Sequence, residues 1–126
     1  MKARSEAALI MRYIVAKRGE LAPGERRIVC TSRGEIGVFN VNGQYFAVRN
    51  VCPHAGAPLC LGTLTGTRFA TRPYEYTYAR DGMVLRCPWH GWEFDLETGR
   101  TFFDPRVRVK TYRVVEEEGE VVLYLE

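Results

Sequence analysis

Two short segments of this chain each hold one cysteine and one histidine with a proline between them. The first reads Cys52-Pro53-His54 and the second reads Cys87-Pro88-Trp89-His90. Thiolate and imidazole are both ligands of transition metals, so each segment can supply two ligands. The prolines, with a glycine shortly after each segment, indicate shaped loops rather than strands. Two loops that are distant in sequence can therefore enclose one metal centre.

The chain around these loops predicts an all-β domain. Segments rich in Val, Tyr, Phe and Thr alternate with turn signals. Asn42-Gly43 favours a type I′ hairpin turn, and Asp81-Gly82 predicts a second hairpin turn. Short strands are expected at residues 13–16, 27–31, 35–41, 44–49, 83–86, 106–115 and 120–125.

Length and composition fit one domain of 126 residues, of which 46% are hydrophobic. We expect residues 1–10 to be a disordered leader and residues 11–126 to form the domain. No apolar run is long enough to cross a bilayer. The net charge of +3 comes without a basic patch or motif that would indicate nucleic-acid binding. The sequence thus predicts a cytoplasmic protein without a membrane or nucleic-acid partner.

The four cysteines allow two interpretations. An even number could form two disulfides, but a cytoplasmic chain with an adequate core does not need them, and cysteines near histidines favour a metal site. Cys52 and Cys87 are the candidate ligands. Cys30 and Cys60 are expected to be buried thiols.

The pattern C-x-H…C-x-x-H, followed by Gly91-Trp92, resembles the Rieske family. The segments Ala55-Gly56-Ala57-Pro58-Leu59 and Phe94-Asp95-Leu96-Glu97-Thr98-Gly99 are also similar to the stretches that follow the two ligand pairs in that family. The alternative, a structural Cys₂His₂ zinc site, has no reason to carry these flanking segments.

The resemblance implies one [2Fe–2S] cluster per chain, with Cys52 and Cys87 on one iron and His54 and His90 on the other. It also implies an antiparallel β-sandwich with a small inserted cluster-binding subdomain, at about residues 50–96. Compared with Rieske ferredoxins, the gap between His54 and Cys87 is long. We expect its extra residues, 65–79, to form an extended hairpin, with Tyr74, Tyr76 and Tyr78 either packed on the domain or forming a docking face.

Four residues bear on the redox potential. High-potential Rieske proteins have a disulfide between the cluster loops, and Ala57 and Trp89 stand at the matching positions. They also have two hydroxyl donors, and Trp92 and Phe94 stand at those positions. Hydrogen bonds to the sulfurs stabilise the reduced cluster. The absence of these hydroxyl donors predicts a reduction potential near the low end of the Rieske range.

The chain is expected to carry electrons rather than to catalyse a reaction. Ring-hydroxylating oxygenases need a mononuclear iron held by further histidines, whereas this chain has only two histidines, both assigned to the cluster. The expected partners are a reductase and a terminal oxygenase or similar acceptor. The alternative is a non-catalytic Rieske subunit, or a redox-regulatory module, of a larger oxidoreductase complex. Arg106, Arg108 and Lys110 alternate with valines and form a solvated or a partner-steering basic face.

Overall fold

The described part of the chain is built mainly from β-strands. The computed structural model describes residues 11–53, 56–72, 75–89, 91–102, 104 and 106–125, with side chains described outside 65–82. Leu59–Leu61 forms a short 3-10 helix. Within these residues, no helix is long and apolar enough to span a bilayer.

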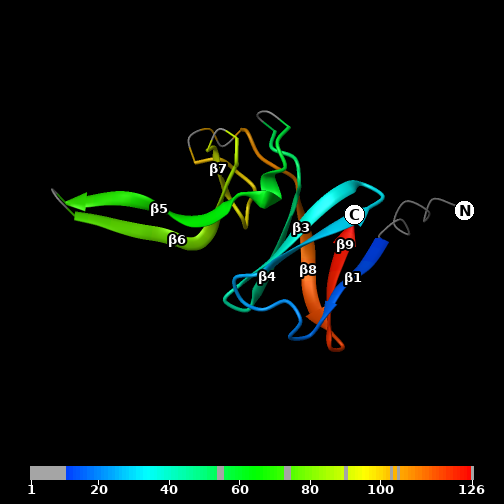
Figure 1. The fold of residues 1–126 in the computed structure, drawn as a ribbon. Coiled ribbons are helices and arrows are strands. Elements are labelled where there is room, and N and C mark those ends of the chain that lie inside the picture. The colour runs from blue at the N-terminus through cyan, green and yellow to red at the C-terminus, as the bar shows by residue number, and fades with distance from the viewer. Residues whose placement is uncertain are drawn as a thin grey trace, which may run out of the picture.

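Six strands form the larger sheet, in the spatial order β1-β9-β8-β4-β3-β2 (Figure 1). Every neighbouring pair in this sheet is antiparallel. The strands are β1 (Met11–Lys17), β2 (Arg26–Thr31), β3 (Gly34–Val41), β4 (Gln44–Arg49), β8 (Thr111–Glu117) and β9 (Glu120–Leu125).

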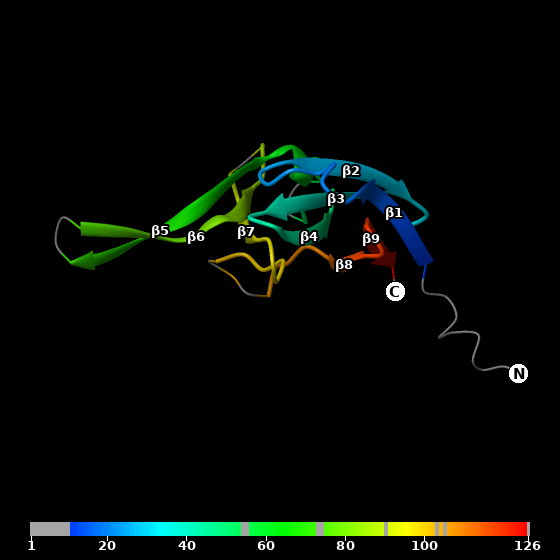
Figure 2. The same cartoon turned by 90° about the horizontal axis from the view of Figure 1, so that it is seen from below.

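The two outer strands of this sheet, β1 and β2, lie side by side. The Arg27 guanidinium donates to the Val15 carbonyl at 2.7 Å, and the Ser32 amide donates to the Tyr13 hydroxyl at 3.2 Å. The sheet therefore folds over on itself and encloses an apolar interior (Figure 2). This arrangement of antiparallel strands confirms the predicted antiparallel β-sandwich.

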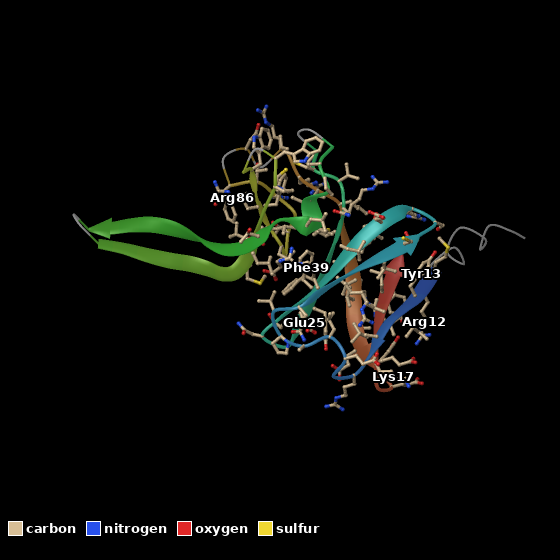
Figure 3. The ribbon with its side chains drawn as sticks, in the orientation of Figure 1. Arg12, Tyr13, Lys17, Glu25, Phe39 and Arg86 are labelled. Carbon is tan, nitrogen blue, oxygen red and sulfur yellow. The ribbon has the colours of Figure 1, made fainter. Side chains whose placement is uncertain are left out.

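The β3–β4 hairpin separates two apolar cores. Because side chains alternate along a strand, Ile36 and Val38 on β3 face the interior of the larger sheet, whereas Phe39 and Val41 face the other core. Phe39, labelled in Figure 3, is fully buried there. The predicted Asn42-Gly43 turn is confirmed, since both residues have positive φ and Val41 pairs with Gln44.

The smaller sheet holds three strands, in the order β5-β6-β7: β5 (Thr63–Arg72), β6 (Glu75–Arg86) and β7 (Glu93–Asp95). β5 and β6 form a long antiparallel hairpin that extends away from the larger sheet in Figures 1 and 2. At its base Thr63 pairs with Arg86. The extended hairpin expected from the sequence is therefore present. Tyr74 lies outside the described residues, as do the side chains of Tyr76 and Tyr78.

The prediction of a hairpin turn at Asp81-Gly82 is wrong. β6 runs through these residues, and the last pair of the hairpin within the described residues is Arg72 with Glu75. Thr65 pairs with Val84 while Thr67 pairs with Ala79, so β6 carries extra residues at this point. Asp-Gly is a turn signal, but a glycine also suits a bulge, and here the bulge prevails.

The final hairpin begins later than predicted. Strand β8 starts at Thr111, and residues 106–110 form scattered pairs instead of a strand. Arg100 and Arg108 form an isolated bridge, the Val109 amide donates to the Gly99 carbonyl at 2.8 Å, and the Lys110 carbonyl accepts from the Arg49 amide of β4 at 2.9 Å. The predicted alternation holds nevertheless. Val109 is buried, whereas Arg106, Arg108 and Lys110 are exposed.

Asn40 gives a test of the hairpin that separates the two cores. Its buried side-chain amide donates to the Leu21 carbonyl at 2.7 Å, and its oxygen accepts from the Gly43 amide at 2.8 Å. Replacing Asn40 by Ala leaves the buried Leu21 carbonyl without this partner and removes the bond to the Gly43 amide in the turn, so we expect the free energy of unfolding to fall by about 2 kcal/mol. Thermal unfolding followed by far-UV circular dichroism measures the loss.

The control for this substitution is Asn42→Gly in the same turn. Asn42 is exposed and has a φ of 52°, a conformation that glycine adopts readily. The control should change stability by less than about 0.5 kcal/mol. Equal melting temperatures for the two variants would contradict a structural role of the Asn40 side chain.

Candidate metal centre

The first predicted ligand loop follows β4. The Gly56 amide donates to the Cys52 carbonyl at 2.8 Å, and the Cys52 amide donates to the Ala57 carbonyl at 2.8 Å. Cys52 is only 1% exposed. The two hydrogen bonds close the loop into a tight turn with the cysteine at its start.

The second loop, after β6, repeats this arrangement. The Gly91 amide donates to the Cys87 carbonyl at 3.0 Å, and the Cys87 amide donates to the Trp92 carbonyl at 2.8 Å. Cys87 is 2% exposed. Each cysteine is therefore bonded to the residues four and five positions later, so the two loops hold their cysteines in equivalent backbone settings.

Glycine is required at the same point of both loops. Gly56 and Gly91 have φ values of 76° and 75°, in the left-handed region that other residues adopt only at a cost. The predicted ligands His54 and His90 lie between the cysteine and the glycine of their loops and fall outside the described residues. The structure thus places Cys52 and Cys87 and leaves the two histidines as a prediction.

Cys52 and Cys87 belong to one buried apolar cluster. This cluster is the second core, which the β3–β4 hairpin separates from the interior of the larger sheet. Two candidate thiolate ligands from loops far apart in sequence are therefore brought to one apolar region, as one shared metal centre requires. The other buried members of the cluster are Phe39, Val41, Val48, Ala57, Leu59, Cys60, Leu85, Phe94, Leu96 and Val109.

Two polar side chains tie the first loop to the larger sheet. The Asn50 side-chain oxygen accepts from the Cys60 amide at 2.7 Å, and its amide nitrogen donates to the Glu35 carboxylate at 3.0 Å. The Arg26 guanidinium donates to the carbonyls of Cys60 and Gly62. Sequence reasoning missed both Asn50 and Arg26, because neither belongs to a motif and their partners are backbone groups far along the chain.

The segment after the second loop is fixed by Asp95. Its carboxylate accepts from the amides of Glu97 and Thr98, at 2.8 and 3.3 Å, and its carbonyl accepts from the Gly99 amide at 2.7 Å. An acidic residue at the start of a turn commonly makes such bonds. The turn that follows β7 therefore starts from a buried anchor just beyond the second loop.

Cys60 is buried, as predicted, and its environment makes it a poor metal ligand. Its thiol packs so closely on β3 that a Cβ added at Gly37 would lie 2.4 Å from the sulfur, and it donates to the Val48 carbonyl at 3.5 Å. Burial raises the pKa of the Cys60 thiol to about 12. The thiol therefore stays protonated at neutral pH, whereas metal ligation needs the thiolate.

Cys30 contradicts the prediction of a buried thiol. It is exposed, because it lies on the outward side of the edge strand β2. No disulfide joins any of the four cysteines, which all lie in the described part of the chain, so the two-disulfide interpretation fails. At the positions of the high-potential disulfide, Ala57 is fully buried and Trp89 is 59% exposed.

Comparison with known proteins decides the family. The profile of the Rieske [2Fe-2S] domain matches residues 11–113. This chain belongs to the Rieske family. It carries one [2Fe–2S] cluster, and the buried pair Cys52 and Cys87 fits a cluster that needs two thiolate ligands from two loops.

Individual Rieske relatives are similar over most of this chain. Ferredoxin CarAc of Metapseudomonas resinovorans is 30% identical over 109 residues, which cover 85% of this chain and 87% of that protein. A solved complex of reduced oxygenase and oxidised ferredoxin in carbazole 1,9a-dioxygenase contains a chain with a TM-score of 0.69 and 29% identity, covering 89% of this chain and 91% of that one. The ferredoxin relatives agree with the prediction of an electron carrier rather than an enzyme.

A different relative is much longer. Apoptosis-inducing factor 3 of mouse and human is 34% identical over 80 residues, which cover 64% of this chain. The chain spans 11% of the length of those proteins. The matched segment is therefore a small part of those longer proteins.

The four cysteines give a direct test of the ligand assignment. Cys52→Ser and Cys87→Ser each remove one thiolate, so we expect both variants to lose the cluster almost completely. Cys60→Ala serves as the matched buried control and Cys30→Ser as the exposed control. Both should keep two irons and two acid-labile sulfides per chain, measured by iron and sulfide assays. A cluster lost from Cys60→Ala, or retained in Cys52→Ser, would contradict the assignment.

Proposed function

We propose that this chain is a one-electron carrier that passes electrons from a reductase to an oxygenase-type acceptor. Its cluster is bound by Cys52, His54, Cys87 and His90. The observation that carries the proposal is the pair of matching loops that bury Cys52 and Cys87 in one apolar cluster. The bound cluster supplies reversible one-electron chemistry.

The residues of the site hold the ligands in place and exclude water. The hydrogen bonds that close the two loops fix the backbone at Cys52 and Cys87. Asn50 and Arg26 anchor the first loop, and Asp95 anchors the segment after the second. Such outer hydrogen bonds orient the ligands, so little rearrangement accompanies the change of charge.

The apolar surroundings favour a low potential. Phe94 is 1% exposed and has no hydroxyl to donate, and Ala57 offers no sulfur for an inter-loop disulfide. Added negative charge is less stable where donors are few and the surroundings are apolar. The potential is therefore expected in the lower part of the Rieske range, about −150 to +300 mV.

The carrier is proposed to act in the cytoplasm. Relatives such as CarAc are bacterial ferredoxins, and the exposed, unpaired Cys30 suits a compartment that keeps thiols reduced. Residues 11–126 are proposed as the Rieske domain, with residues 50–96 as the cluster-binding subdomain. Residues 1–10 are proposed as a leader to that domain.

A Rieske subunit within a larger complex is the second candidate, favoured by the match to the longer apoptosis-inducing factor 3 proteins. Size-exclusion chromatography of native extract separates the two. A free carrier elutes as a species near its own mass of 14.4 kDa, whereas a subunit co-elutes with its partners.

Redox titration tests the proposed carrier. We expect one electron per chain and a midpoint potential below about +100 mV, because the hydroxyl donors of the high-potential class are absent. Electron paramagnetic resonance of the reduced protein follows the titration. A two-electron step, or a potential above that value, would count against the proposal.

Phe94→Tyr tests the cause of the low potential. A phenol at this position restores one hydrogen-bond donor, which is expected to stabilise the reduced cluster by about 1 kcal/mol, or about 40 mV for one electron. Phe46→Tyr is the control, since Phe46 on β4 packs against the same apolar cluster. The idea fails if both variants shift the potential equally or if neither does.

A further inference from the structure

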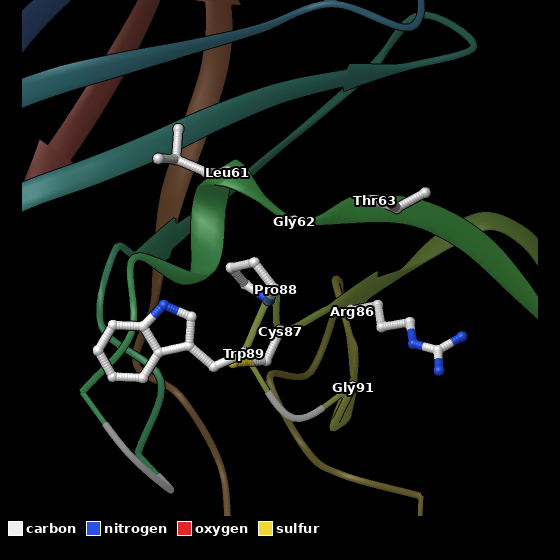
Figure 4. Close-up of a pocket in the computed structure, with 8 residues that line it drawn as sticks. All are labelled: Leu61, Gly62, Thr63, Arg86, Cys87, Pro88, Trp89 and Gly91. Carbon is white, nitrogen blue, oxygen red and sulfur yellow. The ribbon is translucent and has the colours of Figure 1, made fainter.

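A pocket of about 510 Å³ adjoins the second cluster loop (Figure 4). One wall is Leu61 to Thr63, at the end of the 3-10 helix and the start of β5. The other wall is Arg86 to Trp89, with Gly91. Because Cys87 itself lines the pocket, a molecule seated there would lie directly against a ligand loop.

The rim of the pocket is apolar and exposed. Leu61 is 64% exposed and Trp89 is 59% exposed, the two largest values among the large hydrophobic side chains that the structure describes. Apolar side chains left in water beside a ligand loop favour burial against a partner. Tryptophan in particular is frequent at the energetic centre of protein interfaces.

Arg86 is the one charged side chain among the residues that line the pocket. Its guanidinium lies against the second loop, since a Cβ added at Gly91 would be 3.0 Å from Nη2 and 3.1 Å from Nε. Within the described part of the chain, no carboxylate lies within ion-pair distance of Arg86. An exposed positive charge therefore stands one residue before Cys87, and its guanidinium is available to an anion.

We propose that this pocket is the docking site of an acidic redox protein. The partner places a carboxylate on the Arg86 guanidinium, which suits two parallel hydrogen bonds, and packs apolar side chains over Leu61 and Trp89. The charge complementarity favours this partner over a basic one, which Arg86 would repel. The inference rests on the proposed one-electron carrier and adds the face and the chemistry of its partner.

Stopped-flow reduction by an acidic plant-type [2Fe–2S] ferredoxin tests the docking site. At low ionic strength we expect Arg86→Gln to lower the second-order rate constant by about fivefold or more and to weaken its dependence on salt. Arg86→Lys, which keeps the charge but not the planar fork, should lie between wild type and Arg86→Gln. Trp89→Ala and Leu61→Ala should slow the reaction while leaving its salt dependence unchanged.

Two controls separate a local site from general effects. Arg108→Gln removes the same charge from an exposed position outside the pocket, and Ile14→Ala removes an apolar side chain that is 55% exposed on β1. Neither should change the rate by more than about twofold. Equal slowing by Arg86→Gln and Arg108→Gln, or unchanged rates in Arg86→Gln and Trp89→Ala, would overturn the proposed site.

Dithionite reduction distinguishes failure of this inference from failure of the proposed function. Every variant should hold its cluster and accept one electron per chain from dithionite. The midpoint potential measured for each variant allows the reduction rates to be compared at equal driving force. A wild-type protein that accepts no single electron would remove the carrier function itself. If the wild-type protein accepts one electron but the reduction rate does not depend on Arg86, only the proposed docking site is overturned.

Discussion

The structure depends on one constraint: two loops far apart in sequence must present their cysteines to the same centre. The second apolar core meets this constraint by burying Cys52 and Cys87 together. The β3–β4 hairpin forms the boundary of that core. Alternate side chains of β3 pack into the interior of the larger sheet on one face and into the core that holds Cys52 and Cys87 on the other. The same hairpin therefore contributes side chains to both the interior of the sandwich and the core around the two cysteines.

Polarity is distributed unevenly around this centre. The interior side is apolar, with Phe94 and Ala57 where high-potential relatives have polar or bridging groups. The outer side has Arg86 and the exposed ring of Trp89. The interior environment bears on how readily the centre accepts an electron, whereas the outer environment bears on which protein can approach it.

The sequence was sufficient to predict the features set by local chemistry. Asn42-Gly43 predicts its turn because asparagine and glycine adopt the positive φ of this turn type more readily than other residues do. Cys52 and Cys87 are recognisable from their spacing and flanking residues. The turn predicted at Asp81-Gly82 is wrong because this dipeptide suits both a turn and a bulge, and strand pairing decides between them. The exposure of Cys30 follows from the outward face of β2 on which its side chain lies. Asn50 and Arg26 could not be predicted, since their role depends on long-range contacts.

The pairing of Thr63 with Arg86 at the base of the β5–β6 hairpin has a consequence for how such proteins can vary. This pair joins the end of the first loop region to the start of the second, so the separation of the loops is set at the base of the hairpin. Residues added or removed beyond that base lengthen or shorten the hairpin without moving the cysteines. The long gap in this chain is thus compatible with the same centre as a short one. The outer hairpin is a position at which insertions, epitopes or whole domains can be accommodated while the redox site is kept.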